Sequence, residues 1–318
     1  MKTAALFLLI VASAPGDTTS ADEQDATQLE NAMTNAASML AQRSDADSLA
    51  AAAVLTRLTD STLAEQLAAR ASAAAPQRPD LLWLQAQLCK EVPGCDRKPL
   101  DSKLHALDPE NGAIFLPRLQ DVGDAMDPVE TDRLLAAAAA SKRVDFYWNR
   151  LISRLAPAVL STKTLPPGQS LTAVIGAASG VVIPALAGAG VPCRDWVRRE
   201  ERRTQCKAIA RAFLQGDTVI AQVAGANMTQ ALWPADSPET RAAKEASRTL
   251  TYQISTNGAD SARRLLDEAG VRRYLDKMAR YRREQDLIVA ELVDAGRSPL
   301  PPADWRAGPP PNGAPATR

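Results

Sequence analysis

Four cysteines in two local pairs are the residues whose spacing is best suited to chemistry. Cys89 and Cys95 enclose five residues, and Cys193 and Cys206 enclose twelve. Four cysteines allow three connectivities, and loop closure favours near partners. We therefore expect disulfides between Cys89 and Cys95 and between Cys193 and Cys206. Zinc is the alternative, but neither spacing resembles a CxxC pair and His105 is the single histidine, so no metal site is expected.

Acidic residues are the second candidate for chemistry. Glycosidases place two carboxyl groups on either side of the bond that they cleave. Asp145, Glu200, Glu201 and Asp217 lie near aromatic or basic residues and are examples of acids that could form such a pair. Pairing across a fold is invisible in a sequence, and solvated helix faces explain the same residues.

Local catalytic motifs are missing from the sequence. There is no GxSxG, HExxH, Walker or GxGxxG pattern. No serine or cysteine motif points to His105 as a base, which favours a structural or surface histidine. The sequence thus supplies no catalytic residue and no cofactor-binding residue, and no cofactor is expected.

The N-terminus has the pattern of an export signal. Lys2 precedes an uncharged apolar run over residues 4–14, and Pro15-Gly16 comes before the small residues 19–21. We expect a signal peptide over residues 1–21 and a periplasmic or secreted protein, which agrees with the expected disulfides. A retained anchor or a buried first helix is the alternative.

Composition predicts an all-α protein. Alanine and leucine are abundant, aromatic residues make up 4%, and no stretch alternates like a strand before a tight turn. Lysine plus arginine and aspartate plus glutamate both number 37, so net charge gives no reason to expect nucleic-acid binding.

A helical repeat appears when the large apolar residues are aligned. Leu49, Trp83, Phe115 and Trp148 are separated by 34, 32 and 33 residues, and each follows an acidic or proline-containing turn. Further start signals between these anchors, such as Asp60-Ser61, Asp96 or Asp101, and Asp127-Pro128, predict a second helix in each repeat. Helical hairpins of this kind bury their apolar faces by stacking on one another.

Residues 45–155 resemble the tetratricopeptide repeat family. Ala64, Ala71 and Pro76 match one unit, and residues 107–111 (LDPEN) followed by Phe115 match a junction between units. Arg97 and Asp101 depart from the family pattern. The resemblance implies that a concave face binds peptides or protein segments. The chain is also similar to exported helical proteins of Gram-negative bacteria, which implies no activity.

Tyr147 and Trp148 are the candidate partner-binding residues of this region. Adjacent residues on a helix point about 100° apart, so both rings are hard to bury together. The other aromatic anchors are expected to pack between repeats.

Residues 171–191 carry no charge, and the segment after them, residues 194–207, is rich in arginine. A membrane-spanning helix is one interpretation. Pro184, the many small residues and the acids among the arginines favour a buried core helix or a kinked pair, followed by a salt-bridged turn.

The predicted organisation follows from these segments. We expect a tetratricopeptide-like helical-hairpin array over residues 22–162, a C-terminal helical bundle over residues 163–296, and a disordered proline-rich tail over residues 297–318. Within the bundle, Gly216-Asp217 marks a turn and Asp260-Ser261 marks the start of a long helix reaching Leu292.

The functional expectation is an exported, non-enzymatic helical-repeat scaffold that binds a protein or peptide partner in the cell envelope, without stable membrane insertion. Two alternatives stay open: an envelope enzyme with a carboxylate pair in a cleft between the domains, and a structural subunit of an envelope complex.

Overall fold

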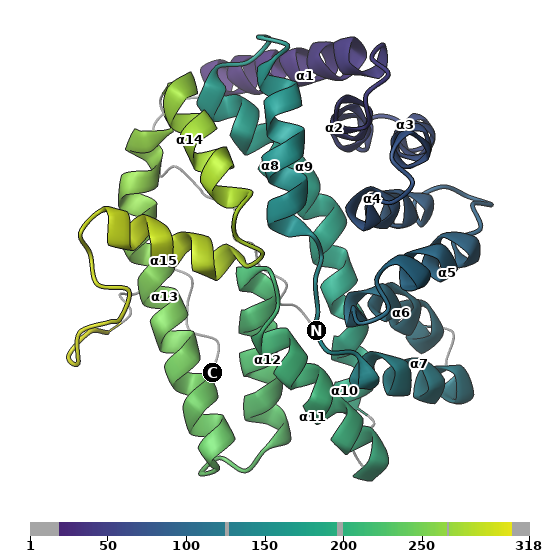
Figure 1. The fold of residues 1–318 in the computed structure, drawn as a ribbon, viewed down its shortest axis with the longest axis vertical. Helices are drawn as coiled ribbons and strands as arrows, with labels where there is room; N and C mark the ends of the chain where they lie inside the picture. The colour runs from purple at the N-terminus through teal and green to yellow at the C-terminus, as the bar shows by residue number, and fades with distance from the viewer. Residues whose placement is uncertain (1–18, 125–126, 196–199, 266, 307–318) are drawn as a thin grey trace.

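The computed structural model describes residues 19–124, 127–195, 200–265 and 267–306, and these residues form an all-α fold (Figure 1). The α-helices are α1 (Thr19–Ala41), α2 (Ala46–Thr56), α3 (Ser61–Ala74), α4 (Pro79–Cys89), α5 (Lys98–Leu107), α6 (Leu116–Asp124), α7 (Pro128–Ala140), α8 (Trp148–Leu160), α9 (Pro167–Leu186), α10 (Gly190–Asp195), α11 (Glu200–Leu214), α12 (Val219–Leu232), α13 (Pro238–Arg264), α14 (Glu268–Met278) and α15 (Glu284–Asp294). Two short 3₁₀ helices, η1 (Gly112–Phe115) and η2 (Ala187–Ala189), precede α6 and α10. The predicted fold class is confirmed.

Short acidic caps start several helices where the sequence predicts them. The side chains of Asp45 and Asp60 accept hydrogen bonds from backbone N–H groups in the first turns of α2 and α3, and Asp127 does the same for α7. The sequence predicts that Asp260 and Ser261 start a helix, and that prediction is wrong. They lie inside α13, and Asp267 caps α14 instead.

Helices α2 to α7 follow one another down one side of the molecule, with α2 packed on α3, α4 on α5, and α6 on α7 (Figure 1). Helix α9 packs against α2, α4 and α6, so one face of this array is covered by the chain itself. Helices α11 to α15 make up most of the opposite side (Figure 1). The division at residue 163 stays a prediction, as does the tetratricopeptide-like arrangement.

The uncharged segment forms α9, η2 and the start of α10. Leu171, Val174, Ala178 and Val181 recur at helical spacing and are buried in the common hydrophobic core. Among the described residues, no helix is both long and apolar enough to cross a membrane.

The chain end differs in part from the disordered tail expected from its prolines. Residues up to 306 lie against α13, where the Arg248 guanidinium donates a hydrogen bond to the carbonyl of Pro302 and Trp305 packs edge-on against Tyr252. These contacts give the segment fixed partners on α13. The rest of the predicted tail, residues 307–318, lies outside the described residues. Residues 1–18 of the predicted signal peptide also lie outside the described residues, so the signal peptide stays a prediction.

Both expected disulfides are present, joining Cys89 to Cys95 and Cys193 to Cys206. The first closes the loop after α4. The second ties α10 to α11 and places Cys206 in the core with no exposed surface. Each bridge therefore fixes a connection between helices.

We expect the double variant Cys193→Ala, Cys206→Ala to lose about 3 kcal/mol of unfolding free energy, because the unfolded chain regains the entropy of the opened loop. Urea denaturation without reductant measures this loss. The matched variant Cys89→Ala, Cys95→Ala opens a shorter loop and should lose about 2 kcal/mol. A larger loss from the shorter loop would contradict the entropic explanation.

Candidate functional site

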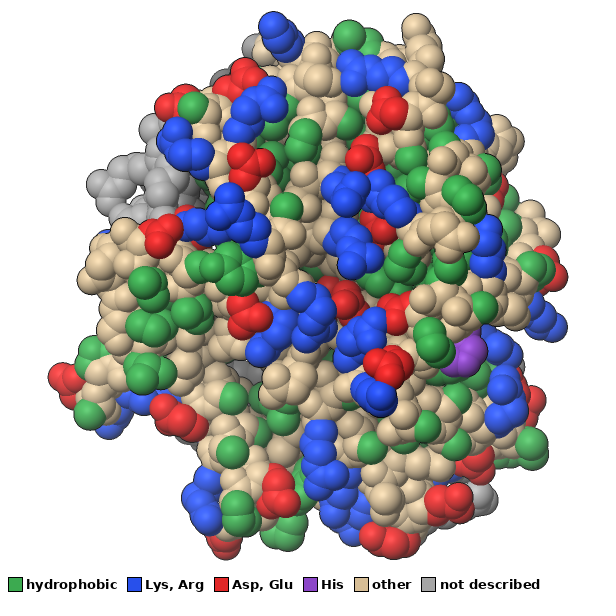
Figure 2. All heavy atoms as spheres, in the orientation of Figure 1, with side chains coloured by type: hydrophobic (Ala, Val, Ile, Leu, Met, Phe, Trp, Pro, Cys, Tyr) green, Lys and Arg blue, Asp and Glu red, His purple; other side chains and the backbone are tan. Residues whose placement is uncertain are grey.

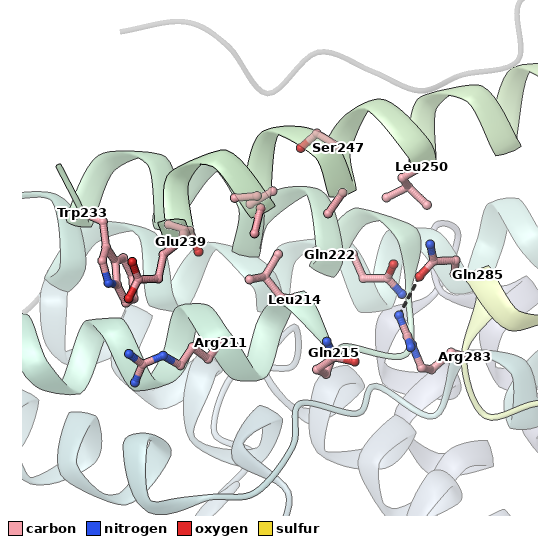
Figure 3. Close-up of a pocket in the computed structure, with 15 residues that line it drawn as sticks. Arg211, Leu214, Gln215, Gln222, Trp233, Glu239, Ser247, Leu250, Arg283 and Gln285 are labelled. Carbon is pink, nitrogen blue, oxygen red and sulfur yellow. Dashed lines mark hydrogen bonds between the residues drawn. The ribbon is translucent and has the colours of Figure 1, made fainter. Parts of the chain in front are cut away.

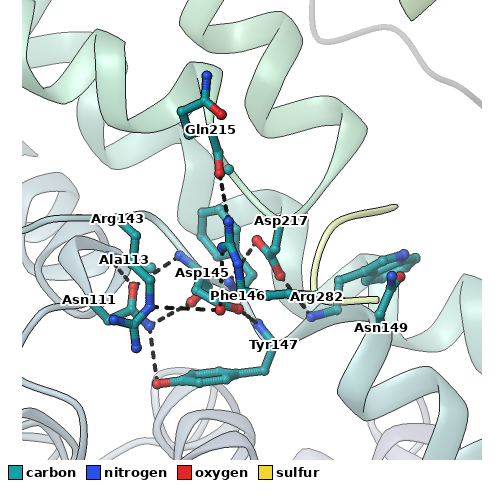
Figure 4. A network of polar contacts seen from close by, with 12 residues as sticks. Asn111, Ala113, Arg143, Asp145, Phe146, Tyr147, Asn149, Gln215, Asp217 and Arg282 are labelled. Atoms are coloured by element: carbon teal, nitrogen blue, oxygen red, sulfur yellow. Dashed lines mark hydrogen bonds and ion pairs between the residues drawn. The ribbon is translucent and has the colours of Figure 1, made fainter. Parts of the chain in front are cut away.

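Three turns meet at one buried point, which we call the three-turn junction: residues 145–149, 215–219 and 281–285. These segments lead into α8, α12 and α15. Asp145 and Asp217, both named as candidate carboxylates from the sequence, lie together at this junction with exposures of 6% and 0% (Figure 4). The structure thus brings together two acids that are far apart in the sequence.

Asp217 holds the start of α8. Its two carboxylate oxygens accept hydrogen bonds from the backbone N–H groups of Phe146 and Trp148, each at 2.9 Å. Trp148 is the first residue of α8. The positive end of a helix dipole favours a negative charge at this position, so Asp217 acts as a long-range helix cap.

Glu284 links the other two turns. Its side chain accepts a hydrogen bond at 2.8 Å from the backbone N–H of Val219, the first residue of α12. Its own backbone N–H donates to the Asp217 carbonyl oxygen at 2.7 Å. The starts of α8, α12 and α15 are therefore joined by carboxylates that satisfy backbone donors.

Tyr147 adopts a left-handed backbone conformation, with φ of 60°, between Asp145 and α8. Such a conformation is strained for a bulky residue. The Tyr147 hydroxyl donates to Asp108 at 2.7 Å and accepts from the Asn111 amide at 3.1 Å. Asn111 also exchanges two hydrogen bonds with the backbone of Asp145. These bonds hold the strained turn in place.

Asp145 affects the protonation of Asp217. Burial and the neighbouring Asp145 charge raise the pKa of Asp217 well above the usual value for aspartate. Arg282 and Arg143 approach Asp145 at 3.6 and 3.9 Å, which offsets part of the negative charge. The pair is a structural unit, because both Asp217 oxygens already accept backbone N–H groups.

A pH dependence of stability follows from the raised pKa of Asp217. Above about 3.9, the ordinary pKa of aspartate, the folded protein holds a proton that the unfolded chain has lost. We therefore expect this contribution to the unfolding free energy to be lost as pH rises through the raised pKa. Asp145→Asn removes the neighbouring charge and should reduce the slope of the unfolding free energy against pH. Urea denaturation from pH 4 to 9 measures this slope, and Asp276→Asn, at an exposed position on α14, is the control. Equal slopes in the unmodified protein and both variants would contradict an effect of Asp145 on Asp217.

A cavity of about 480 Å³ opens beside the junction, between α11, α12 and α13 (Figure 3). Close approach of α11 and α12 shapes it: a Cβ atom at Gly225 would lie 2.5 Å from the backbone nitrogen of Leu214. Arg283, Gln285 and Gln222 lie at one end of the cavity, and Trp233 and Glu239 lie at the other (Figure 3). Its size is in the range of small-molecule and peptide side-chain pockets.

Arg283 is the cavity residue with unused hydrogen-bonding capacity. Its Nε atom is buried and has no hydrogen-bond partner. One terminal nitrogen donates to the Gln285 amide oxygen at 2.6 Å, and the other lies 3.7 Å from Asp286. A buried unsatisfied donor costs about 1 to 3 kcal/mol. Because the junction fixes residues 281–285, it also fixes Arg283 in the cavity wall.

Trp233 forms the opposite end. Lys207 and Arg211 lie over its ring at 5.1 and 5.2 Å from the centroid. Glu239, in the first turn of α13, lines the same end. The cavity therefore has charged ends and, between them, a wall made mainly of alanine and leucine side chains.

The remaining residues named from the sequence lie elsewhere. Glu200 and Glu201 are exposed at the start of α11, and His105 is exposed on α5 with its ring against Phe115. The sequence predicts a salt-bridged turn for the arginine-rich segment, but Arg202 is buried within helix α11 and pairs with Asp132 of α7. Within the described part of the chain, no cluster of histidine, cysteine and acidic side chains could hold a metal ion.

Tyr147 and Trp148 are both in the core, with exposures of 4% and 8%. Tyr147 packs against Trp83 at a centroid distance of 6.4 Å. Their proposed contact with a partner stays a prediction. Arg283 was missed because the sequence pattern places it within one long helix, and no glycine or proline marks the turn between α14 and α15.

Basic and acidic side chains are intermixed across the face shown in Figure 2. Arg78 pairs with Asp47 and with the buried Asp80, and Arg143 pairs with the buried Asp108. No extended field of one sign is therefore produced by these residues.

The fold and the cavity together define an all-α protein of packed helical hairpins with an amphipathic pocket in its C-terminal half. No family model, curated protein or solved structure matches the chain.

Proposed function

We propose that the chain is an exported, non-enzymatic helical scaffold that binds a protein or peptide partner in the cell envelope, and that it does so through the cavity between α11 and α13. The observation that carries this proposal is a pocket with charged ends, Arg283 at one and Glu239 at the other, and an apolar middle. Such a pocket has groups that recognise a ligand and fix its orientation.

Two features favour the cavity over the concave face that the tetratricopeptide resemblance implies. Helix α9 already packs against α2, α4 and α6, so one face of the helical array is occupied. The cavity is open and is bordered by exposed residues of α13, including Ala246. Both disulfides support export, because such bonds persist in oxidising compartments.

An envelope enzyme that uses Asp145 and Asp217 is the second candidate, since the two acids do meet between the hairpin array and the C-terminal helices. Their geometry supports it less well. Asp217 uses both oxygens as acceptors for Phe146 and Trp148, and neither acid lines the cavity. A catalytic pair needs carboxyl oxygens that can reach a substrate.

Photocrosslinking tests the proposed function. A benzophenone amino acid replaces Ala246 at the cavity rim in the full chain, expressed in its native host. We expect a discrete adduct with a protein or peptide, and Arg283→Gln in the same chain should reduce its yield. The control position is Leu58, which is 82% exposed on the turn after α2. Equal labelling at both positions, or none at Ala246, would argue against binding at this cavity.

A further inference from the structure

The Arg283 end of the cavity has the chemistry of a carboxylate site. Arg283 lines this end, and one of its terminal nitrogens donates a hydrogen bond to the Gln285 amide oxygen at 2.6 Å. A guanidinium group can bind a carboxylate through its terminal nitrogens, and these are the donors available here because the Nε atom is buried. Asp286 lies 3.7 Å from the other terminal nitrogen, beyond hydrogen-bonding distance.

The middle of the cavity suits small apolar side chains. Ala226, Ala243 and Leu250 are buried in its wall, and Ala242 and Ala246 border its opening. Alanine leaves room beside the α13 backbone that a larger residue would fill. Gln215 and Gln222 add amide groups near the Arg283 end, where a peptide backbone needs hydrogen-bond partners.

The length of the cavity limits the size of the occupant. Its α13 wall runs from Glu239 to Leu250, which is about 16 Å at the rise of an α-helix. An extended peptide of about five residues covers that distance. Trp233 and Glu239 then meet the residues furthest from the peptide's C-terminus.

We propose that the cavity receives the free C-terminus of a short, mainly apolar peptide segment, with its carboxylate on Arg283 and its small side chains along α13. This inference rests on the proposed function and names the part of the partner that is recognised. A fatty acid shares the carboxylate and the apolar chain, but it has no groups to pair with Gln215 and Gln222.

Calorimetric titration of the full chain with acetylated pentapeptides of alanine and leucine tests this inference. We expect the free acid to bind at least about tenfold more tightly than the C-terminal amide, as loss of a charge-assisted hydrogen bond requires. Arg283→Gln should remove that preference, whereas Arg280→Gln, which replaces an exposed arginine in the turn after α14, should keep it. Arg283→Lys retains the charge, and Ala246→Phe blocks the cavity without touching Arg283; both should weaken binding of the free acid.

Each other outcome overturns the inference in a recognisable way. Equal binding of acid and amide would eliminate the carboxylate site but leave peptide binding intact. Binding of decanoate without binding of either peptide would eliminate the peptide occupant and count against the proposed function as well. Absence of all binding would eliminate the occupant, whereas an adduct at Ala246 would still support a partner of different chemistry. Circular dichroism of each variant verifies that it is folded.

Discussion

Replacing Asp217 by alanine should lower the free energy of unfolding by about 3 to 5 kcal/mol. The variant leaves the backbone N–H groups of Phe146 and Trp148 buried without their 2.9 Å acceptors. Removal of the buried acid beside Asp145 offsets a small part of the loss.

Urea denaturation of Asp217→Ala measures this loss. Two further variants test whether the loss comes from the missing acceptor oxygens. Asp217→Asn keeps one acceptor oxygen and should lose less than the alanine variant. Asp276→Ala, at an exposed acid on α14, should change the unfolding free energy by less than about 0.5 kcal/mol. A loss below about 1 kcal/mol for Asp217→Ala would mean that the junction does not depend on this carboxylate.

Trp83→Ala is expected to cost about 3 to 5 kcal/mol of unfolding free energy. Trp83 is fully buried on α4, and its ring meets Phe146 edge-on at 5.8 Å and Tyr147 at 6.4 Å. Its removal leaves a cavity between the hairpin array and the three-turn junction. The effect should therefore reach both parts of the fold.

The matched variant for this prediction is Trp83→Phe. The Trp83 indole nitrogen is buried without a hydrogen-bond partner, so phenylalanine loses volume but relieves an unpaired donor. We expect a cost below about 1.5 kcal/mol. A double-mutant cycle of Trp83→Ala with Asp217→Ala should show coupling, because both side chains act on Phe146. Additive effects, or equal costs for alanine and phenylalanine, would contradict this packing.

Local features of the fold could be predicted from the sequence. Caps such as Asp45 and Asp60 act on N–H groups within three residues, so their signal lies in a short window. The disulfide partners were also close in sequence. The prediction that a helix starts at Asp260 is wrong because cap-forming residues are tolerated inside a helix when packing stabilises it. Here α12 and α15 both pack on α13, which supplies that packing.

Much less of the candidate site could be predicted from the sequence. Asp217 and Phe146 are 71 residues apart, and no sequence pattern in either segment predicts their contact. Asp145 and Asp217 are candidates for glycosidase-like chemistry in the sequence, but in the structure their carboxylates accept backbone hydrogen bonds from the turn before α8 and its first residue. Arg283 gave no signal, because its unpaired Nε arises from the packing of three helices around a cavity.

The most direct test of binding at the α11–α13 cavity is hydrogen exchange of the full chain with and without a saturating peptide that carries a free C-terminus. We predict slower exchange in residues 211–250 and 281–287, where the cavity wall and Arg283 lie, and unchanged exchange in α2 to α6. Protection confined to α2 to α6 would place the binding surface on the hairpin array and contradict the proposed site.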